Sequence, residues 1–244
     1  MSTARTLATT RRVLQQLEHD RRSIALLLLV PSILLTLFKY VYSGDSRAFD
    51  RIGPQLLGIF PFVVMFLITS VTMVRERTSG TLERLLTTRL RRSELVGGYG
   101  LAFGVAAVAQ AMVTAAVAIG PLRMDVHHTA VIGLFAILDA LLGTSLGLLM
   151  SAFAVTEFQA VQFMPAVVLP QLLLCGLLNP RSAMSYPLRW VSDVMPLSYA
   201  TDGISAAAGH PGLAGTVYFD GAVVLGCLLL AVALAGATLR RRTD

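Results

Sequence analysis

The side chains that could do chemistry in this chain gather in one stretch, from Val74 to Val96. It lies between two long apolar segments and holds six of the twenty lysine and arginine residues. Gly80 can cap the start of a helix, and Glu83 stands three residues later, where it can reach a free backbone N–H. Leucines then recur at helical spacing: Leu82, Leu85, Leu86 and Leu90. An apolar stripe backed by polar side chains predicts a short amphipathic helix, either a lever that contacts a partner or a surface helix without one.

A second candidate is Asp139, which lies well inside another apolar segment. A carboxylate at the bilayer midplane costs about 2.5–3.5 kcal/mol on insertion scales, so Asp139 should face protein or water. Gln110 and Thr114 are candidate hydrogen-bond partners. A structural, protonated acid is favoured over a proton or substrate site. The remaining candidates for a substrate path are Gln55, Thr69, Gln162 and Gln171. Such residues can contact an amphipathic substrate or simply join helices.

Other motifs argue against catalysis. The only lysine is Lys39 and no G-x-x-x-x-G-K-[ST] loop is present, so the chain cannot bind ATP in the P-loop manner. Ser145 lies within a G-x-S-x-G pattern, but the serine hydrolase elbow needs a strand–turn–helix and a histidine base. The adjacent His127 and His128 do not share a helix face, which disfavours a metal site. We expect no catalytic residue, no cofactor and no metal in this chain.

The elements that must position these residues are membrane spans. The chain is 55% hydrophobic and only 14% charged, with a mean hydropathy of +0.70. Its apolar residues fall in long runs and no linker divides them, which predicts one all-α integral membrane domain over residues 1–244. Six transmembrane helices are expected, each able to cross the ~30 Å hydrocarbon core: 23–42, 53–74, 95–119, 130–154, 159–178 and 217–239.

Helices outside the spans are expected at three places. An N-terminal interfacial helix precedes the first span, and the amphipathic helix separates spans two and three. Two short outer-leaflet helices separate spans five and six; Pro187 opens the first, Pro196 ends it, and Ser198 caps the second. Close packing of span three on span four is predicted by two small-xxx-small pairs, Gly100 with Gly104 and Gly143 with Gly147.

The positive charges predict the orientation. With a cytoplasmic N-terminus, fourteen of the twenty cationic residues fall on the inside: five before the first span, six between spans two and three, and three at the C-terminus. This bias predicts a multi-pass protein of the plasma (inner) membrane with both termini in the cytoplasm. The net charge of +6 is concentrated beside the spans, so no nucleic acid partner is expected.

The central stretch resembles the hallmark of ABC-2 type permeases, the membrane subunits of a class of ATP-driven exporters. That hallmark reads E-R-x-x-G-T-L-E-x-L-L-x-T-P-L-x-R-x-E-L, and residues 76–95 follow it except that Arg89 replaces the usual proline. Thr156-Glu157 resembles a T-x-E-Q-A run before span five, and residues 196–202 resemble a later P-L-T-Y-x-x-D. The greatest similarity is to drug-export permeases of the daunorubicin-resistance type.

This resemblance implies a permease subunit that exports a drug, antibiotic or lipid-like substrate by alternating access. ATP and Mg would lie on a separate ABC ATPase subunit present in two copies. The other partners would be membrane lipid and a second permease, either a homodimer mate or a close homologue. The implied coupling residues are Glu76, Gly80, Thr81, Leu82, Glu83, Leu85, Leu86 and Glu157. Two alternatives remain: a proton-coupled secondary transporter using Asp139, disfavoured because no inverted repeat is seen, and a membrane serine hydrolase at Ser145.

Overall fold

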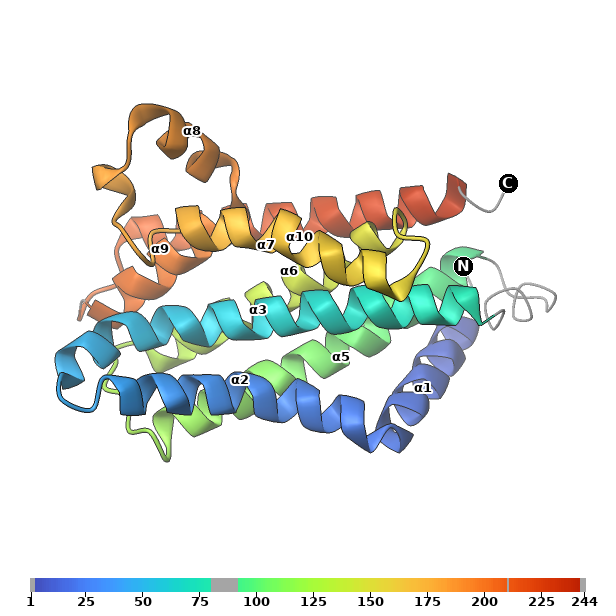
Figure 1. Cartoon of the computed structure of the whole chain (residues 1–244), viewed down its shortest axis with the longest axis horizontal. Coiled ribbons are helices and arrows are strands. Elements are labelled where there is room, and N and C mark those ends of the chain that lie inside the picture. Colours follow the sequence, from blue (N-terminus) through green and yellow to red (C-terminus); the bar gives the residue numbers. More distant parts are fainter. Residues whose placement is uncertain (1–2, 80–91, 210, 242–244) are drawn as a thin grey trace.

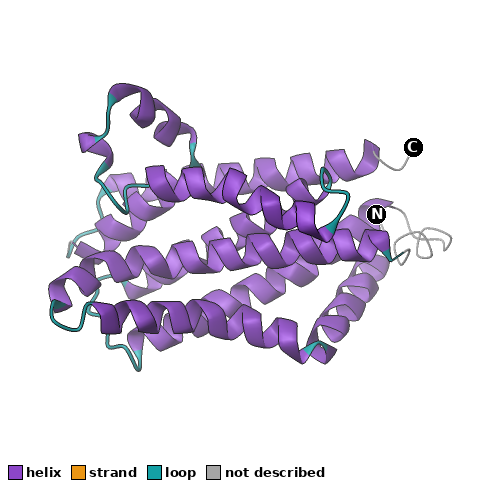
Figure 2. Cartoon of the chain, in the orientation of Figure 1, coloured by secondary structure: helices purple, strands orange, loops and turns teal. Residues whose placement is uncertain are grey.

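The chain folds into a bundle of long helices, and the computed structural model describes residues 3–79, 92–209 and 211–241. Figure 1 labels the helices along the chain. They are α1 (Thr3–His19), α2 (Arg21–Val41), α3 (Ser46–Thr78), α5 (Arg92–Ile119), α6 (Thr129–Ser151), α7 (Glu157–Leu174), the 3-10 helix η1 (Arg181–Ala183), α8 (Tyr186–Val194), α9 (Pro196–Gly209) and α10 (Gly215–Arg241). Over these residues no strand is present (Figure 2), which confirms the predicted all-α class.

Six of the helices are long and apolar enough to cross a membrane: α2, α3, α5, α6, α7 and α10. They match the six predicted spans in order. The main difference is α3, which extends the predicted 53–74 at both ends. Asp45 caps the start of α3 by accepting a hydrogen bond from the Ala48 backbone N–H.

The bundle has two distinct ends. The terminal end carries α1, the last turn of α3 and the end of α10, whereas the far end carries η1, α8 and α9 (Figure 1). At the terminal end α1 lies at an angle to the spans and packs on α5. An added Cβ at Gly98 would lie 2.6 Å from the Thr9 side chain, so glycine permits this close crossing. A helix before the first span is therefore confirmed.

The turn between α1 and α2 is closed by Asp20. Its carboxylate accepts hydrogen bonds from the Ser23 hydroxyl at 2.6 Å and the Ser23 backbone N–H at 3.2 Å. These bonds stabilise the charged form and hold the pKa of Asp20 below its ordinary value. Asp20 is thus the N-cap of α2, at the point where the chain changes direction between α1 and α2.

The centre of the bundle is the α3–α6 pair. An added Cβ at Gly143 would lie 2.2 Å from the Phe62 backbone oxygen, and one at Gly147 would lie 2.6 Å from that of Phe66. The prediction that this glycine pair packs span four on span three was wrong, because both glycines face α3. Helix α5 does pack on α6, but Gly104 contributes only ordinary contact, with 3.5 Å between its added Cβ and Leu141.

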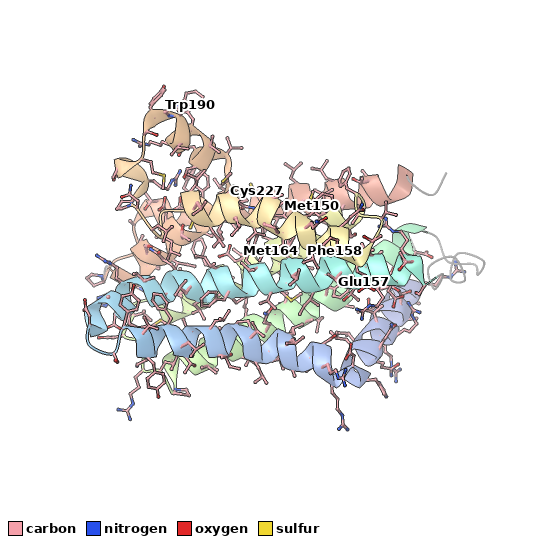
Figure 3. The ribbon with its side chains drawn as sticks, viewed as in Figure 1. Met150, Glu157, Phe158, Met164, Trp190 and Cys227 are labelled. Carbon is pink, nitrogen blue, oxygen red and sulfur yellow. The ribbon has the colours of Figure 1, made fainter. Side chains whose placement is uncertain are left out.

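The far end contains the two predicted short helices, with one correction. Pro196 does not only end α8; it is also the first residue of α9. The first position of a helix suits proline, because the backbone N–H that proline lacks would have no partner within the helix there. Ser198 therefore lies inside α9, where its hydroxyl lies 3.1 Å from that of Ser192. Trp190 is exposed on α8 (Figure 3).

A charged cluster links η1, α8 and α9. The Arg181 guanidinium pairs with the carboxylates of Asp193 and Asp202, and lies 5.1 Å from the centre of the Tyr199 ring. Burial raises the pKa of Asp202 above its ordinary value, and the Arg181 contact opposes part of that rise. The short helices are thereby joined by side chains as well as by the loop between them.

Candidate functional site

The last turn of α3 is the point where the structure concentrates its polar contacts between helices. Three consecutive residues, Arg75, Glu76 and Arg77, occupy this turn. Successive residues of an α-helix point about 100° apart, since one turn takes about 3.6 residues. Each of the three can therefore reach a different neighbour, and each does so.

Glu76 is buried, with 5% of its surface exposed, and it accepts two hydrogen bonds. The Gln16 amide of α1 donates at 2.6 Å, and the Tyr99 hydroxyl of α5 donates at 2.7 Å. The Arg12 guanidinium donates at 2.7 Å to the same Tyr99 oxygen and lies 5.8 Å from the ring centre. This Arg12–Tyr99–Glu76–Gln16 network ties α1, α3 and α5 together, and a cleft of about 150 Å³ opens beside it.

Arg75 points to α7. Its Nε and Nη2 donate to the two carboxylate oxygens of Glu157, each at 2.9 Å, and Figure 3 shows Glu157 at the end of α7 beside α3. Both side chains are partly exposed, so this pair contributes about 1 kcal/mol or less to stability. Its bidentate geometry mainly sets the position of α7 relative to α3.

Arg77 points to the turn between α6 and α7. Its Nη2 donates to the backbone oxygens of Ser151 at 2.6 Å and Ala154 at 2.5 Å. These carbonyls belong to the C-terminal end of α6 and the turn after it, where the helix leaves acceptors unsatisfied and a cation is favourable. We call the three residues and their partners the α3 junction.

The α3 junction directly precedes the stretch with the strongest sequence signal. Six of the eight predicted coupling residues lie outside the described residues: Gly80, Thr81, Leu82, Glu83, Leu85 and Leu86. The other two, Glu76 and Glu157, both belong to the junction. Each is engaged within this chain, so each can position the neighbouring segment without touching a partner protein.

Sequence reasoning missed most of the junction. It singled out Glu76 and Glu157 but gave no role to Arg12, Gln16 or Tyr99. The sequence offered one signal for such partners: a glutamate at the end of an apolar span needs hydrogen-bond donors if it is buried. Which helices supply them depends on the tertiary packing, and Gln16 lies 60 residues from Glu76 in the sequence.

The four residues of the predicted substrate path do not converge. Gln55 of α3 donates to the Ser205 hydroxyl of α9 at 2.6 Å, while Thr69 is fully buried. On α7, Gln171 is buried and donates to the Val167 carbonyl at 3.1 Å, whereas Gln162 is exposed. Gln162 is exposed and Gln55 is partly exposed, so the four side chains do not line one path, and the path stays a prediction.

Asp139 is fully buried on α6 and faces α3. An added Cβ at Gly58 would lie 2.5 Å from its Oδ2. Neither carboxylate oxygen has a hydrogen-bond partner among the described residues, so the expected bonds to Gln110 and Thr114 are not formed. The Thr114 hydroxyl instead donates to the Gln110 backbone oxygen at 3.0 Å.

The surroundings of Ser145 do not fit the serine hydrolase alternative. Ser145 lies in the middle of α6, not on a strand–turn–helix elbow, and its hydroxyl donates to the Leu141 carbonyl at 2.8 Å. Within the described ranges no three histidine, cysteine or acidic side chains gather as metal ligands would. The α3 junction is suited to a mechanical role, because it joins α3 to four other helices, α1, α5, α6 and α7, at one point.

Comparison with known proteins agrees with this arrangement. The family profile described as ABC-2 type transporter matches residues 4–208. ABC transporter G family member 20 of Dictyostelium discoideum is 29% identical over 157 residues, which cover 64% of this chain and 22% of that protein. The Probable multidrug ABC transporter permease YbhR of Escherichia coli is 28% identical over 152 residues, or 61% of this chain and 41% of that protein. This chain is thus matched to less than half the length of these relatives. With its six apolar helices, it is a multi-pass membrane protein that belongs to the ABC-2 type transporter family.

Proposed function

We propose that this chain is the permease subunit of an ATP-driven ABC exporter. It moves a hydrophobic or amphipathic substrate out of the cell by alternating access, while a separate ABC ATPase, in two copies, binds Mg-ATP and hydrolyses it. A second permease, identical or closely homologous, completes the complex. The terminal end faces the cytoplasm, as the fourteen inside cations predict.

The observation that carries this proposal is the α3 junction. Its last α3 residue, Arg77, lies three residues before Gly80, which opens the 80–91 stretch whose apolar stripe is the predicted contact with the ATPase. That stretch is followed directly by α5 and preceded by α3, and α3 is bonded to α7 through Arg75–Glu157 and to α1 and α5 through Glu76. Rigid helices joined by side-chain bonds are a means by which one element moves several spans together.

The test replaces both Leu85 and Leu86 by aspartate. Two carboxylates in the apolar stripe should release the ATPase from the permease during purification in mild detergent, because burying unpaired charge at an interface is strongly unfavourable. Transport should be lost while the six spans still insert. Retention of both the ATPase and transport would show that the 80–91 stretch is not the contact.

A matched control lies in the same stretch. Thr87 and Thr88 belong to the opposite, polar face of the predicted helix, and replacing both by aspartate adds the same charge. That variant should keep its ATPase. Glu83→Gln separates two roles of Glu83: a pure helix cap should lose little, whereas a charge-paired contact should lose ~1–3 kcal/mol of coupling.

A second candidate function rests on Asp139, a fully buried carboxyl with no partner among the described residues. If Asp139 carries protons, Asp139→Asn should abolish transport in a well-assembled protein, and transport should stop when the proton gradient is collapsed. If Asp139 is structural, the amide keeps its shape and transport should persist. We propose the structural role.

A further inference from the structure

Helix α8 is attached to the rest of the chain by few side chains. Figure 1 shows it projecting from the long helices at the far end, and Ser192 is its one buried residue. Its large apolar side chains are exposed, Trp190 and Val194 among them. An element that buries little apolar surface lies at the low-stability end of a structure and can detach while the rest stays folded. The position of α8 therefore depends on a small number of polar contacts.

Ser192 makes the first of these contacts. Its hydroxyl donates to the Leu174 carbonyl at 2.8 Å and lies 3.1 Å from the Ser198 hydroxyl of α9. Leu174 is the last residue of α7, where carbonyls have no partner within the helix. A single bond between neutral groups has a modest net effect, because water offers the same groups equivalent bonds. Ser192 therefore marks where α8 docks but does not by itself hold it there.

Arg181 of η1 makes the second contact. One terminal nitrogen of its guanidinium pairs with Asp193 of α8 and the other with Asp202 of α9. The guanidinium also lies 5.1 Å from the centre of the Tyr199 ring, and the Tyr199 hydroxyl donates to the Asp193 backbone oxygen at 2.7 Å. The Arg181–Asp193 pair lies within the η1–α8 segment, whereas the Arg181–Asp202 pair crosses from that segment to α9. We call the Arg181–Asp202 pair the latch.

The charges around the latch make Arg181 necessary for the docked position of α8. Asp193, Asp202 and Asp220 of α10 all lie close enough to Arg181 to interact with it electrostatically. Three acids thus surround one cation. Without that cation, Asp193 on α8 would face the like charge of Asp202 on α9, and like charges at short range repel. Loss of the Arg181 charge therefore favours movement of α8 away from α9.

A bend lies at each end of the η1–α8 segment. Residues 175–179 form bends, and Gly176 has a φ of +95°, which glycine adopts without strain. At the other end, Met195 is extended between α8 and α9. Changes at a few such loop residues are enough to swing a short segment as a unit. Release of the polar contacts would leave the segment held by these two connections.

We propose that η1 and α8 form a lid at the far end, held closed by the Arg181–Asp202 latch and opened by rotation at Gly176 and Met195. The Asp193 and Asp202 side chains are about half-exposed, so the latch can open and close without burying an unpaired acid. In the proposed function the far end faces the exterior, so the lid stands where substrate leaves. That consequence rests on the proposed function, whereas the latch does not.

The test measures how often the lid opens. In the purified full chain in mild detergent, with Cys175 and Cys227 replaced by alanine, Ser192→Cys places a thiol where the closed lid leaves no exposed surface. The rate at which this thiol reacts with a maleimide then follows the open fraction. Arg181→Gln in this background should raise that rate about fivefold, the factor expected for loss of one partly exposed ion pair. Arg189→Gln is the matched control, since it removes the same charge from an exposed α8 side chain that makes no ion pair among the described residues.

Two further variants connect the rate to the latch itself. Asp202→Asn should also raise the rate, but by less than Arg181→Gln, because the amide removes the pair and one of the repelling acids together. Adding Asp202→Asn to Arg181→Gln should raise the rate no further, since the latch is already broken. Comparison of Asp202→Asn alone with Arg189→Gln keeps the test decisive should Arg181→Gln fail to fold.

Equal rates for Arg181→Gln, Asp202→Asn and Arg189→Gln would overturn the proposal. A double variant whose rate increase equals the product of the two single increases would do so as well, because the two residues would then act independently. No ATPase takes part in this measurement. A failed latch therefore leaves the proposed ATPase contact standing, and loss of that contact in the Leu85 and Leu86 double variant leaves the labelling rate of the lid unchanged.

Discussion

At the scale of single residues, two buried acids differ in whether their carboxylates have hydrogen-bond partners. Glu76 is buried but accepts two hydrogen bonds, whereas Asp139 is buried against a glycine with no hydrogen bond among the described residues. A partnered buried carboxylate holds elements together, while an unpartnered one must be uncharged or costly. The two acids therefore respond differently to substitution.

Tyr99→Phe tests the partnered site. The change removes the hydroxyl that donates to Glu76 and accepts from Arg12, and leaves the ring in place. Removing one donor from a buried carboxylate should lower stability by about 1–3 kcal/mol. Thermal unfolding in one detergent should show a lower midpoint for this variant, with Tyr218→Phe as the control because Tyr218 is exposed. Equal midpoints for the two variants would contradict the role of the hydroxyl.

Gly58→Ala tests the unpartnered site. The new methyl group would lie 2.5 Å from the Asp139 carboxylate and 2.8 Å from Ile204, so the variant should be destabilised. In an Asp139→Ala background the first of these clashes is gone. A double-mutant cycle on unfolding should therefore give a coupling energy of about 1 kcal/mol or more between the two positions. Additive changes in unfolding free energy for the two substitutions would show that Asp139 does not contact Gly58.

At the scale of elements, the α3–α6 contact depends on two glycines with no room for a methyl group. Gly143→Ala would drive its Cβ into the Phe62 backbone, which cannot move as a side chain can. We expect a loss of about 1–3 kcal/mol in stability and a lower yield of folded protein. Gly133→Ala on the same helix, where nothing lies within 4 Å, should be neutral or slightly stabilising. Equal unfolding midpoints for Gly143→Ala and Gly133→Ala would show that the close contact between α3 and α6 is not present.

The elements also show what a sequence can and cannot predict here. Spans follow from runs of apolar residues, so all six were predicted in order. The partner of each span does not follow from its composition, which is why Gly143 and Gly147 were assigned to the wrong neighbour. Pro196 permits both the end of one helix and the start of the next, and only the tertiary contacts of α9 decide between them. The Glu76 network likewise needs α1 and α5 in place before its donors can be identified.

At the scale of the whole molecule, the α3 junction can serve a cytoplasmic ATPase only if the terminal end of the bundle faces the cytoplasm. The start of α1, the last turn of α3 and the end of α10 all lie at the terminal end of the bundle (Figure 1). The side of the membrane on which one of these three lies is therefore the side of all three. The fourteen cations on that side predict that it faces the cytoplasm.

Cysteine labelling checks this orientation. With Cys175 and Cys227 replaced by alanine, Thr3→Cys reports on the terminal end and Ser182→Cys on the far end; both positions are exposed. An impermeant maleimide should label Ser182→Cys in intact cells and Thr3→Cys only after lysis. The reverse pattern would place the 80–91 stretch outside the cell, where no ATP-hydrolysing partner could reach it.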